Sequence, residues 1–228
     1  MSRRRRQGAA AGRSARRLWA VAGILATVCA QTAMAIGNFN PSPAELRLLP
    51  AYCGPRAQPW GNDANRPEVR RWLQVFGGDY IHMHHYCEAL LRLHKARTEA
   101  DPDRRRGMYQ VALNNLEYVR ERVGSGFVLR AELHVLLAET HAGLGDLGAA
   151  LAEARRSVQA KPDYVRGIAL LADLSVRAGQ AAEARRALEA GLARKPQARR
   201  LRLRLACLDG RAARGCPRGY PAPGEGRR

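Results

Sequence analysis

The sequence lacks the motifs that carry most enzyme chemistry. Its 228 residues contain no phosphate-binding loop, no glycine-rich dinucleotide fingerprint, no G-x-S-x-G nucleophile elbow and no C-x-x-C-H haem site. The acidic residues are scattered along the chain, and no carboxylate pair stands out as a catalytic couple. We therefore predict a protein that is not an enzyme and that needs no cofactor.

The sequence also lacks the pattern of a β-sheet. β-branched residues are sparse, and no segment shows a sustained alternation of apolar and polar residues. From residue 67 to about 210, apolar residues recur instead at spacings of three and four, as in Met83, Tyr86, Leu90 and Leu93. That spacing places them on one face of a helix. The predicted fold class is all-α.

Acidic residues are few beside basic ones, 20 against 39, and the formal net charge of +19 favours anionic partners. Part of the excess lies at the start of the chain. There, seven arginines are followed by an apolar run at 18–30 and by the small residues Ala33 and Ala35. This order is typical of a secretory signal peptide, and the apolar run is too short to span a membrane. We predict a signal peptide at residues 1–35. The alternative is an uncleaved segment, which would be the one predicted contact with a membrane.

Cysteine is scarce, and one of the five cysteines, Cys29, falls within the predicted signal peptide. The remaining four are an even number, which favours disulfides in an oxidising compartment. Of the three possible connectivities we predict Cys53–Cys87 and Cys207–Cys216, because each pair stays within one end of the chain. The alternative is four free, buried thiols. The predicted location is the periplasm or cell envelope.

An internal repeat with a period of 34 residues runs through the second half of the chain. The matching positions are Leu137-Ala138 with Leu171-Ala172, Gly145 with Gly179, Ala150 with Ala184, and Pro162 with Pro196. This pattern resembles the tetratricopeptide repeat, W-x2-L-G-x2-Y, then A-x3-F, then P. In such a unit the small residues let paired helices approach, glycine permits the turn between them and proline ends the second helix. The large aromatic positions depart from the pattern and hold His134, His141, Ile168 and Ser175.

The resemblance implies a solenoid of stacked helix pairs. We predict its clearest repeats at 131–164 and 165–198, a more divergent pair at 80–123 and a short capping helix at 197–208. These form a helical domain over residues 67–210. An irregular, Pro- and Gly-rich N-terminal arm at 36–66 precedes it. A basic Gly/Pro-rich tail at 211–228 follows, and we expect this tail to be disordered beyond Cys216.

The resemblance also implies a binding groove, because the first helix of each repeat faces the concave side of the stack. Carried over position by position, the predicted groove residues are Glu132, Val135, Glu139, Ala142, Gly143, Arg166, Ala169, Asp173, Val176, Arg177 and, in the cap, Arg200. Such a groove suits an extended peptide or a helix of a partner protein. The predicted function is therefore a protein-binding scaffold.

Two other functions stay open at this point. The first is a cationic binder of an anionic polymer or lipid of the envelope, acting through Arg104–Arg106 and through the arginines of residues 199–204. An exported chain would not meet nucleic acid, so none is expected as a partner.

The second of these functions is metal handling. His82 and His85, one helical turn apart, could hold zinc or copper with a third ligand from elsewhere. The competing interpretation, which we favour, is that these histidines line a polar seam against the arm and bind no metal.

Overall fold

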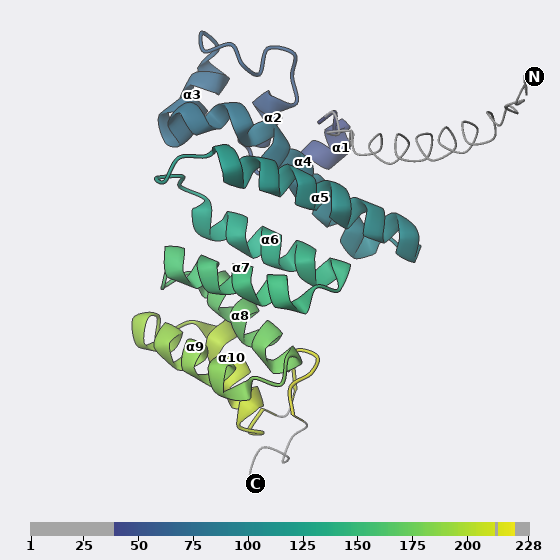
Figure 1. Cartoon of the computed structure of the whole chain (residues 1–228). Helices are drawn as coiled ribbons and strands as arrows, with labels where there is room; N and C mark the ends of the chain where they lie inside the picture. Colours follow the sequence, from purple (N-terminus) through teal and green to yellow (C-terminus); the bar gives the residue numbers. More distant parts are fainter. Residues whose placement is uncertain (1–38, 213, 222–228) are drawn as a thin grey trace, which may run out of the picture. The chain divides into compact units, whose positions relative to one another are not determined.

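The computed structural model describes residues 39–212 and 214–221. The chain divides into two units, 1–35 and 36–228, and all described residues belong to the second. The predicted signal peptide thus lies outside the described residues. Within the described ranges the regular structure is entirely helical, which confirms the predicted fold class (Figure 1). No helix in this part of the chain is both long and apolar enough to cross a membrane.

The N-terminal arm contains more helix than its composition predicts. Its elements are α1 (Pro43–Leu46) and α2 (Cys53–Arg56), and the helical domain then begins with α3 (Pro67–Phe76) and the 3-10 helix η1 (Gly77–His82). Helix α1 begins with a capping box, in which Ser42 and Glu45 satisfy each other's backbone N–H groups, and with proline in the first turn. The Cys53–Cys87 disulfide fixes α2 to the first long helix.

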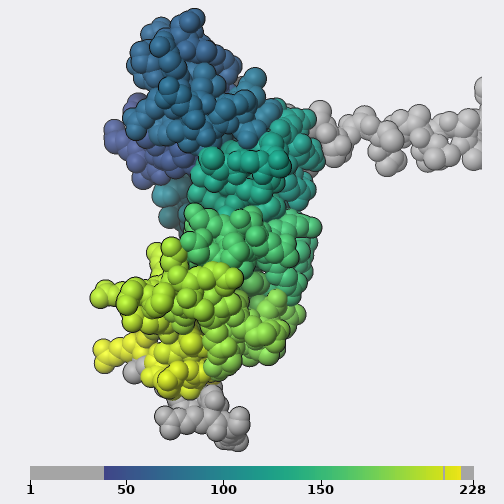
Figure 2. All heavy atoms as spheres, turned by 90° about the vertical axis from the view of Figure 1, so that its left-hand side faces the viewer, coloured from purple at the N-terminus to yellow at the C-terminus, as the bar shows by residue number. Residues whose placement is uncertain are grey.

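Seven further helices follow in the described part of the chain, and each packs on the next. The space-filling view shows the segments covering one another in chain order, from the arm to the C-terminal helix (Figure 2). The helices are α4 (Met83–Thr98), α5 (Pro102–Arg122), α6 (Arg130–Leu144), α7 (Leu147–Ala160), α8 (Val165–Arg177), α9 (Ala181–Arg194) and α10 (Arg199–Leu208).

The residues that recur with a period of 34 lie at helix contacts and turns, as the repeat predicts. The four small residues between paired helices are fully buried: Ala138, Ala150, Ala172 and Ala184. Gly145 and Gly179 have φ values of 89° and 73°, a backbone conformation that favours glycine. Helices α7 and α9 each end two residues before a proline, Pro162 and Pro196 respectively. The apolar residues form three adjoining core clusters, centred on α4–α6, on α6–α8 and on α8–α10.

Both predicted disulfides are present. Cys53 and Cys87 are bonded, as are Cys207 and Cys216. Two disulfides in a chain of this size indicate an oxidising compartment, as outside the cytosol.

Candidate functional site

A hollow of about 360 Å³ opens between α4, α5, α6 and α8. Five of the predicted groove residues line it, of which three are charged: Glu139, Asp173 and Arg177. The other two are Ala142 and Gly143. The rest of its wall is Leu93, Arg97, Tyr109, Leu170 and Leu174. The hollow therefore combines an apolar floor with a rim of both charge signs.

Two predicted groove residues are in the core instead. Val135 is fully buried and Ala169 is 5% exposed, so neither can contact a partner. The reason is geometric: α6 is covered by α5, α7 and α8, and α8 by α7, α9 and α10, which leaves only a narrow strip of each helix open. The repeat pattern cannot show how wide that strip is.

Arg166 is engaged by carboxylates. Its guanidinium lies 2.9 Å from Glu139 and 3.5 Å from Glu132, and Arg97 of α4 reaches Glu139 from the other side at 2.8 Å. Burial raises the pKa of Glu132, and Glu139 adds to this, while Arg166 opposes it. These ion pairs connect α4, α6 and α8, and the positive and negative charges largely compensate each other within the chain.

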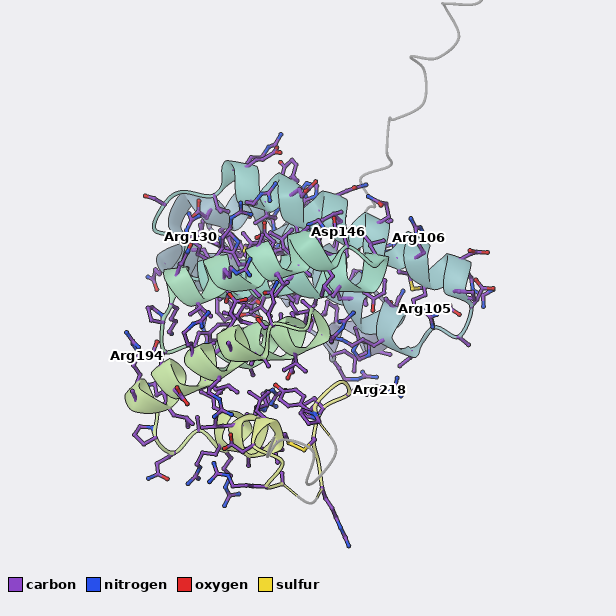
Figure 3. All side chains as sticks on the ribbon, turned by 60° about the horizontal axis from the view of Figure 1, so that its bottom comes forward. Arg105, Arg106, Arg130, Asp146, Arg194 and Arg218 are labelled. Atoms are coloured by element: carbon purple, nitrogen blue, oxygen red, sulfur yellow. A yellow bond between two sulfur atoms is a disulfide. The ribbon has the colours of Figure 1, made fainter. Side chains whose placement is uncertain are left out.

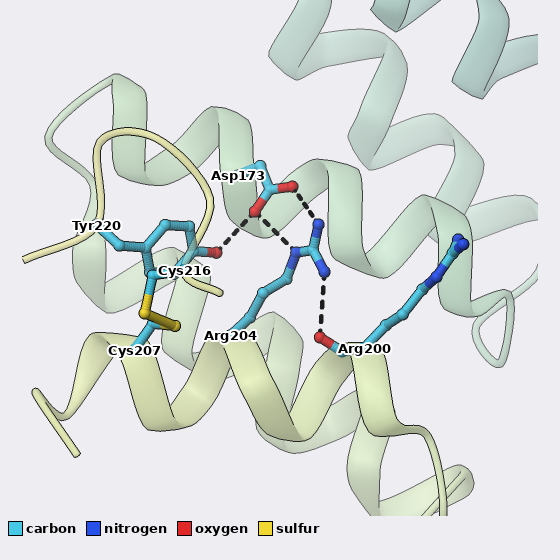
Figure 4. Close-up of a disulfide and its surroundings, with 6 residues drawn as sticks. All are labelled: Asp173, Arg200, Arg204, Cys207, Cys216 and Tyr220. Atoms are coloured by element: carbon cyan, nitrogen blue, oxygen red, sulfur yellow. Dashed lines mark hydrogen bonds and ion pairs between the residues drawn. A yellow bond between two sulfur atoms is a disulfide. The ribbon is translucent and has the colours of Figure 1, made fainter. Parts of the chain in front are cut away.

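Asp173 is also engaged, from the C-terminal side. Arg204 of α10 donates two hydrogen bonds to it, from Nε to Oδ1 at 2.8 Å and from Nη2 to Oδ2 at 2.6 Å. The hydroxyl of Tyr220 donates a third, to Oδ1 at 2.9 Å (Figure 4). Sequence reasoning missed both partners, because neither belongs to the repeat pattern.

Arg177 and Arg200 differ from the other predicted groove cations. Both are exposed, and neither guanidinium has an ion-pair or hydrogen-bond partner among the described residues. Arg200 points away from the Asp173 cluster (Figure 4). Of these two, only Arg177 lines the hollow. It therefore provides the uncompensated positive charge of this site.

A buried polar network connects α5, α6 and α7. His134 Nδ1 lies 2.7 Å from the Glu153 carboxylate, which Arg120 approaches at 3.3 Å and Arg156 also contacts. Burial by itself raises the pKa of Glu153, but the His134 hydrogen bond and the two arginines outweigh it, so that the pKa is lowered overall. In the sequence, the signal for this network was His134, which stands where the repeat pattern has a large aromatic residue.

His82, the last residue of η1, and His85 of α4 lie against α5 and not against the N-terminal arm, where a polar seam was expected. His85 Nδ1 lies 2.7 Å from Asn115 Oδ1, and its ring packs against Tyr118 at a tilt of 37° with 3.8 Å between centroids. Burial lowers the pKa of both His82 and His85, and nearby Arg122 adds to this. In the described ranges no three His, Cys, Asp or Glu side chains converge as metal ligands. Cys87 is bonded to Cys53 and is therefore not available as a ligand beside them.

Other basic side chains lie on the surface away from the hollow. Arg105, Arg106 and Arg194 lie at the periphery of the molecule in this view (Figure 3).

Comparisons with known proteins found no relative. The chain has no significant match to any protein-family model, curated protein or solved structure. The residues of the hollow and their contacts are therefore the basis for a proposed function.

Proposed function

We propose that the protein is an exported scaffold of the tetratricopeptide type, located in the periplasm or cell envelope, that binds an extended acidic segment of a partner protein. The 34-residue repeat supports the family assignment, together with buried small residues and left-handed glycines at the matching positions. The disulfides support export. We define the inner face as the open strips of α4, α6, α8 and α10, which carry Arg97, Glu139, Asp173, Arg177 and Arg200.

The observation that carries the proposal is the free charge of Arg177 at the rim of an apolar hollow. Leu170 and Ala142 offer partly exposed apolar surface for a side chain of the partner. Arg177, which has no counter-ion among the described residues, offers a planar donor to a carboxylate beside it. Because Glu139 and Asp173 are already paired with arginines, a basic segment would find no free carboxylate there.

The test is charge reversal at Arg177 with a matched reversal on another helix. Arg177→Glu places a negative charge at the rim, and we expect affinity for acidic peptides on an array to fall at least tenfold, or about 1.4 kcal/mol. Arg186→Glu, on the exposed surface of α9, makes the same charge change without touching the hollow, and binding should stay within twofold. Helical circular dichroism should match the parent for both variants. Equal loss in the two variants would mean that binding follows net charge and not this site.

A second candidate function rests on a different observation. Arg199, Arg200 and Arg202 of the last helix are exposed, and among the described residues none has an ion-pair partner for its side chain. Such a cluster suits an anionic polymer or lipid headgroup. This function predicts that binding to vesicles containing phosphatidylglycerol falls steeply between low and physiological salt and is lost when all three arginines become glutamine. Binding that is insensitive to both changes would remove this candidate.

A further inference from the structure

The C-terminal segment after α10 folds back onto the inner face. Residues 211–228 were expected to be a tail, disordered beyond Cys216, but residues 216–221 have a defined path. The chain leaves α10 with positive φ at Gly210 (65°) and Gly215 (79°), and Cys216 then bonds Cys207 within α10. We call residues 216–221 the strap.

The strap occupies the part of α8 that borders the hollow. Tyr220 donates its hydroxyl hydrogen bond to Asp173, and its ring packs against the core cluster that contains Ile168 and Leu208. Gly219 lies over the next turn of α8, where a Cβ would come within 3.7 Å of Arg177 Cγ and 3.9 Å of Val176 Cγ1. The strap therefore covers α8 over residues 173–177, which include two residues of the hollow and its free cation.

The two disulfides differ in their accessibility. Cys53 and Cys87 are both fully buried, so a thiol in solution cannot approach either sulfur without local unfolding. Cys207 is also buried, but Cys216 is partly exposed. Thiol–disulfide exchange requires an attacking thiolate to reach a sulfur. The bond that holds the strap is therefore the one that a reductant reaches first.

We infer that the strap is a releasable occupant of the inner face, and that reduction of Cys207–Cys216 by a dithiol uncovers the α8 surface next to the hollow for an acidic partner segment. The inference rests on the proposed function. In the exchange, one thiolate of the dithiol attacks Sγ of Cys216, and Cys207 leaves as a thiolate. The second thiol of the reductant resolves the mixed disulfide, so that Cys216 becomes a thiol and the reductant becomes a disulfide.

The covalent link through Cys207–Cys216 explains why the strap would compete with a partner for the surface of α8. A segment joined by a short linker is present at its site at about millimolar effective concentration. Once the disulfide is open, Tyr220 is held by a longer, flexible connection that contains Gly210 and Gly215, and its local concentration falls. A partner that needs the same strip of α8 then binds about tenfold more tightly.

The experiment uses the full chain in oxidised form and after treatment with dithiothreitol at a concentration that, by alkylation and mass mapping, opens only Cys207–Cys216. Hydrogen–deuterium exchange is followed in the strap and in α8. We expect faster exchange in residues 173–177 and in the strap after reduction, with α4 to α7 unchanged. Unchanged exchange in α8, or faster exchange in all helices, would overturn the inference.

A second variant makes the result independent of the disulfide. Tyr220→Ala removes the docking side chain while both bonds stay closed, and it should expose residues 173–177 to the same extent as reduction. Arg218→Ala is the matched control, because Arg218 lies in the strap but is exposed and its side chain has no partner among the described residues. It should leave exchange unchanged. Equal effects of the two substitutions would contradict a specific docking role for Tyr220.

An acidic peptide selected by binding to Tyr220→Ala separates this inference from the proposed function. Tenfold tighter binding to the reduced or Tyr220→Ala protein than to the oxidised parent supports both. Equal binding to open and closed forms overturns the strap as a competitor and leaves the proposed function standing. If no acidic peptide binds either form while exchange shows the strap opening, the proposed function fails and the claim of control over a partner falls with it.

Discussion

Replacing Glu153 by glutamine should lower the free energy of unfolding more than the same replacement of an exposed glutamate does. Glu153 is 3% exposed and faces His134, Arg120 and Arg156. Glutamine keeps an acceptor for His134 but removes the charge that compensates the two arginines. Both arginines are partly exposed, so water screens part of the effect. We expect the free energy of unfolding to fall by about 2–3 kcal/mol. For a domain of this size, the melting temperature should fall by about 5–10 °C.

The pH dependence provides an independent check. Because the pKa of Glu153 is lowered in the folded protein, its stabilising contribution is present above its unfolded pKa, about 4.3, and is lost as the pH falls through the folded value. The difference between parent and Glu153→Gln should therefore shrink as the pH approaches 3. Urea denaturation at pH 7 and pH 3 measures it. The control is Glu189→Gln, an exposed partner of Arg185 at 3.7 Å, which should cost about 0.5 kcal/mol or less. Equal costs for the two substitutions would refute this reasoning.

Three further predictions concern packing and the covalent framework. Leu171→Ala removes a side chain that is 5% exposed between α7 and α8, and should lower the free energy of unfolding by about 2–5 kcal/mol in urea. Gly143→Ala places a Cβ about 2.4 Å from Tyr109 Cζ, and by displacing that ring should cost about 1–2 kcal/mol despite the better helix propensity of alanine. Replacing Cys53 and Cys87 together by alanine should cost about 3–4 kcal/mol, which calorimetry of the oxidised variants would measure.

The helix pairs could be predicted from the sequence because each depends on local chemistry. Gly145 and Gly179 mark turns that need positive φ, and the prolines after α7 and α9 mark where those helices end. The disulfide pairs followed from cysteine count and proximity along the chain. These features need only short-range information, which a single sequence contains.

The site was predictable only in part, because side-chain pairing depends on contacts between distant segments. The repeat pattern predicted Glu139, Asp173 and Arg177 on one face, and all three line the hollow. It could not show that Arg166 is held by two carboxylates, since Glu132 and Glu139 come from the preceding repeat. Nor could it show that a tail residue, Tyr220, docks 47 positions away on Asp173. A charge reversal at Arg166 would therefore disturb the fold, which is why Arg177 is the better probe.

Photo-crosslinking from the hollow tests the account most directly. A photoreactive phenylalanine at residue 170, in place of Leu170, would lie inside the hollow, and one in place of Ala190 would lie on the exposed surface of α9. Irradiation in envelope extract of the producing cells, followed by peptide mapping, identifies what each position touches. The account predicts that residue 170 crosslinks to partner peptides with Asp or Glu near the linked residue, and that Arg177→Glu abolishes these products. Equal crosslinking from residue 190, or products that survive Arg177→Glu, would contradict the claim that the inner face is the binding surface.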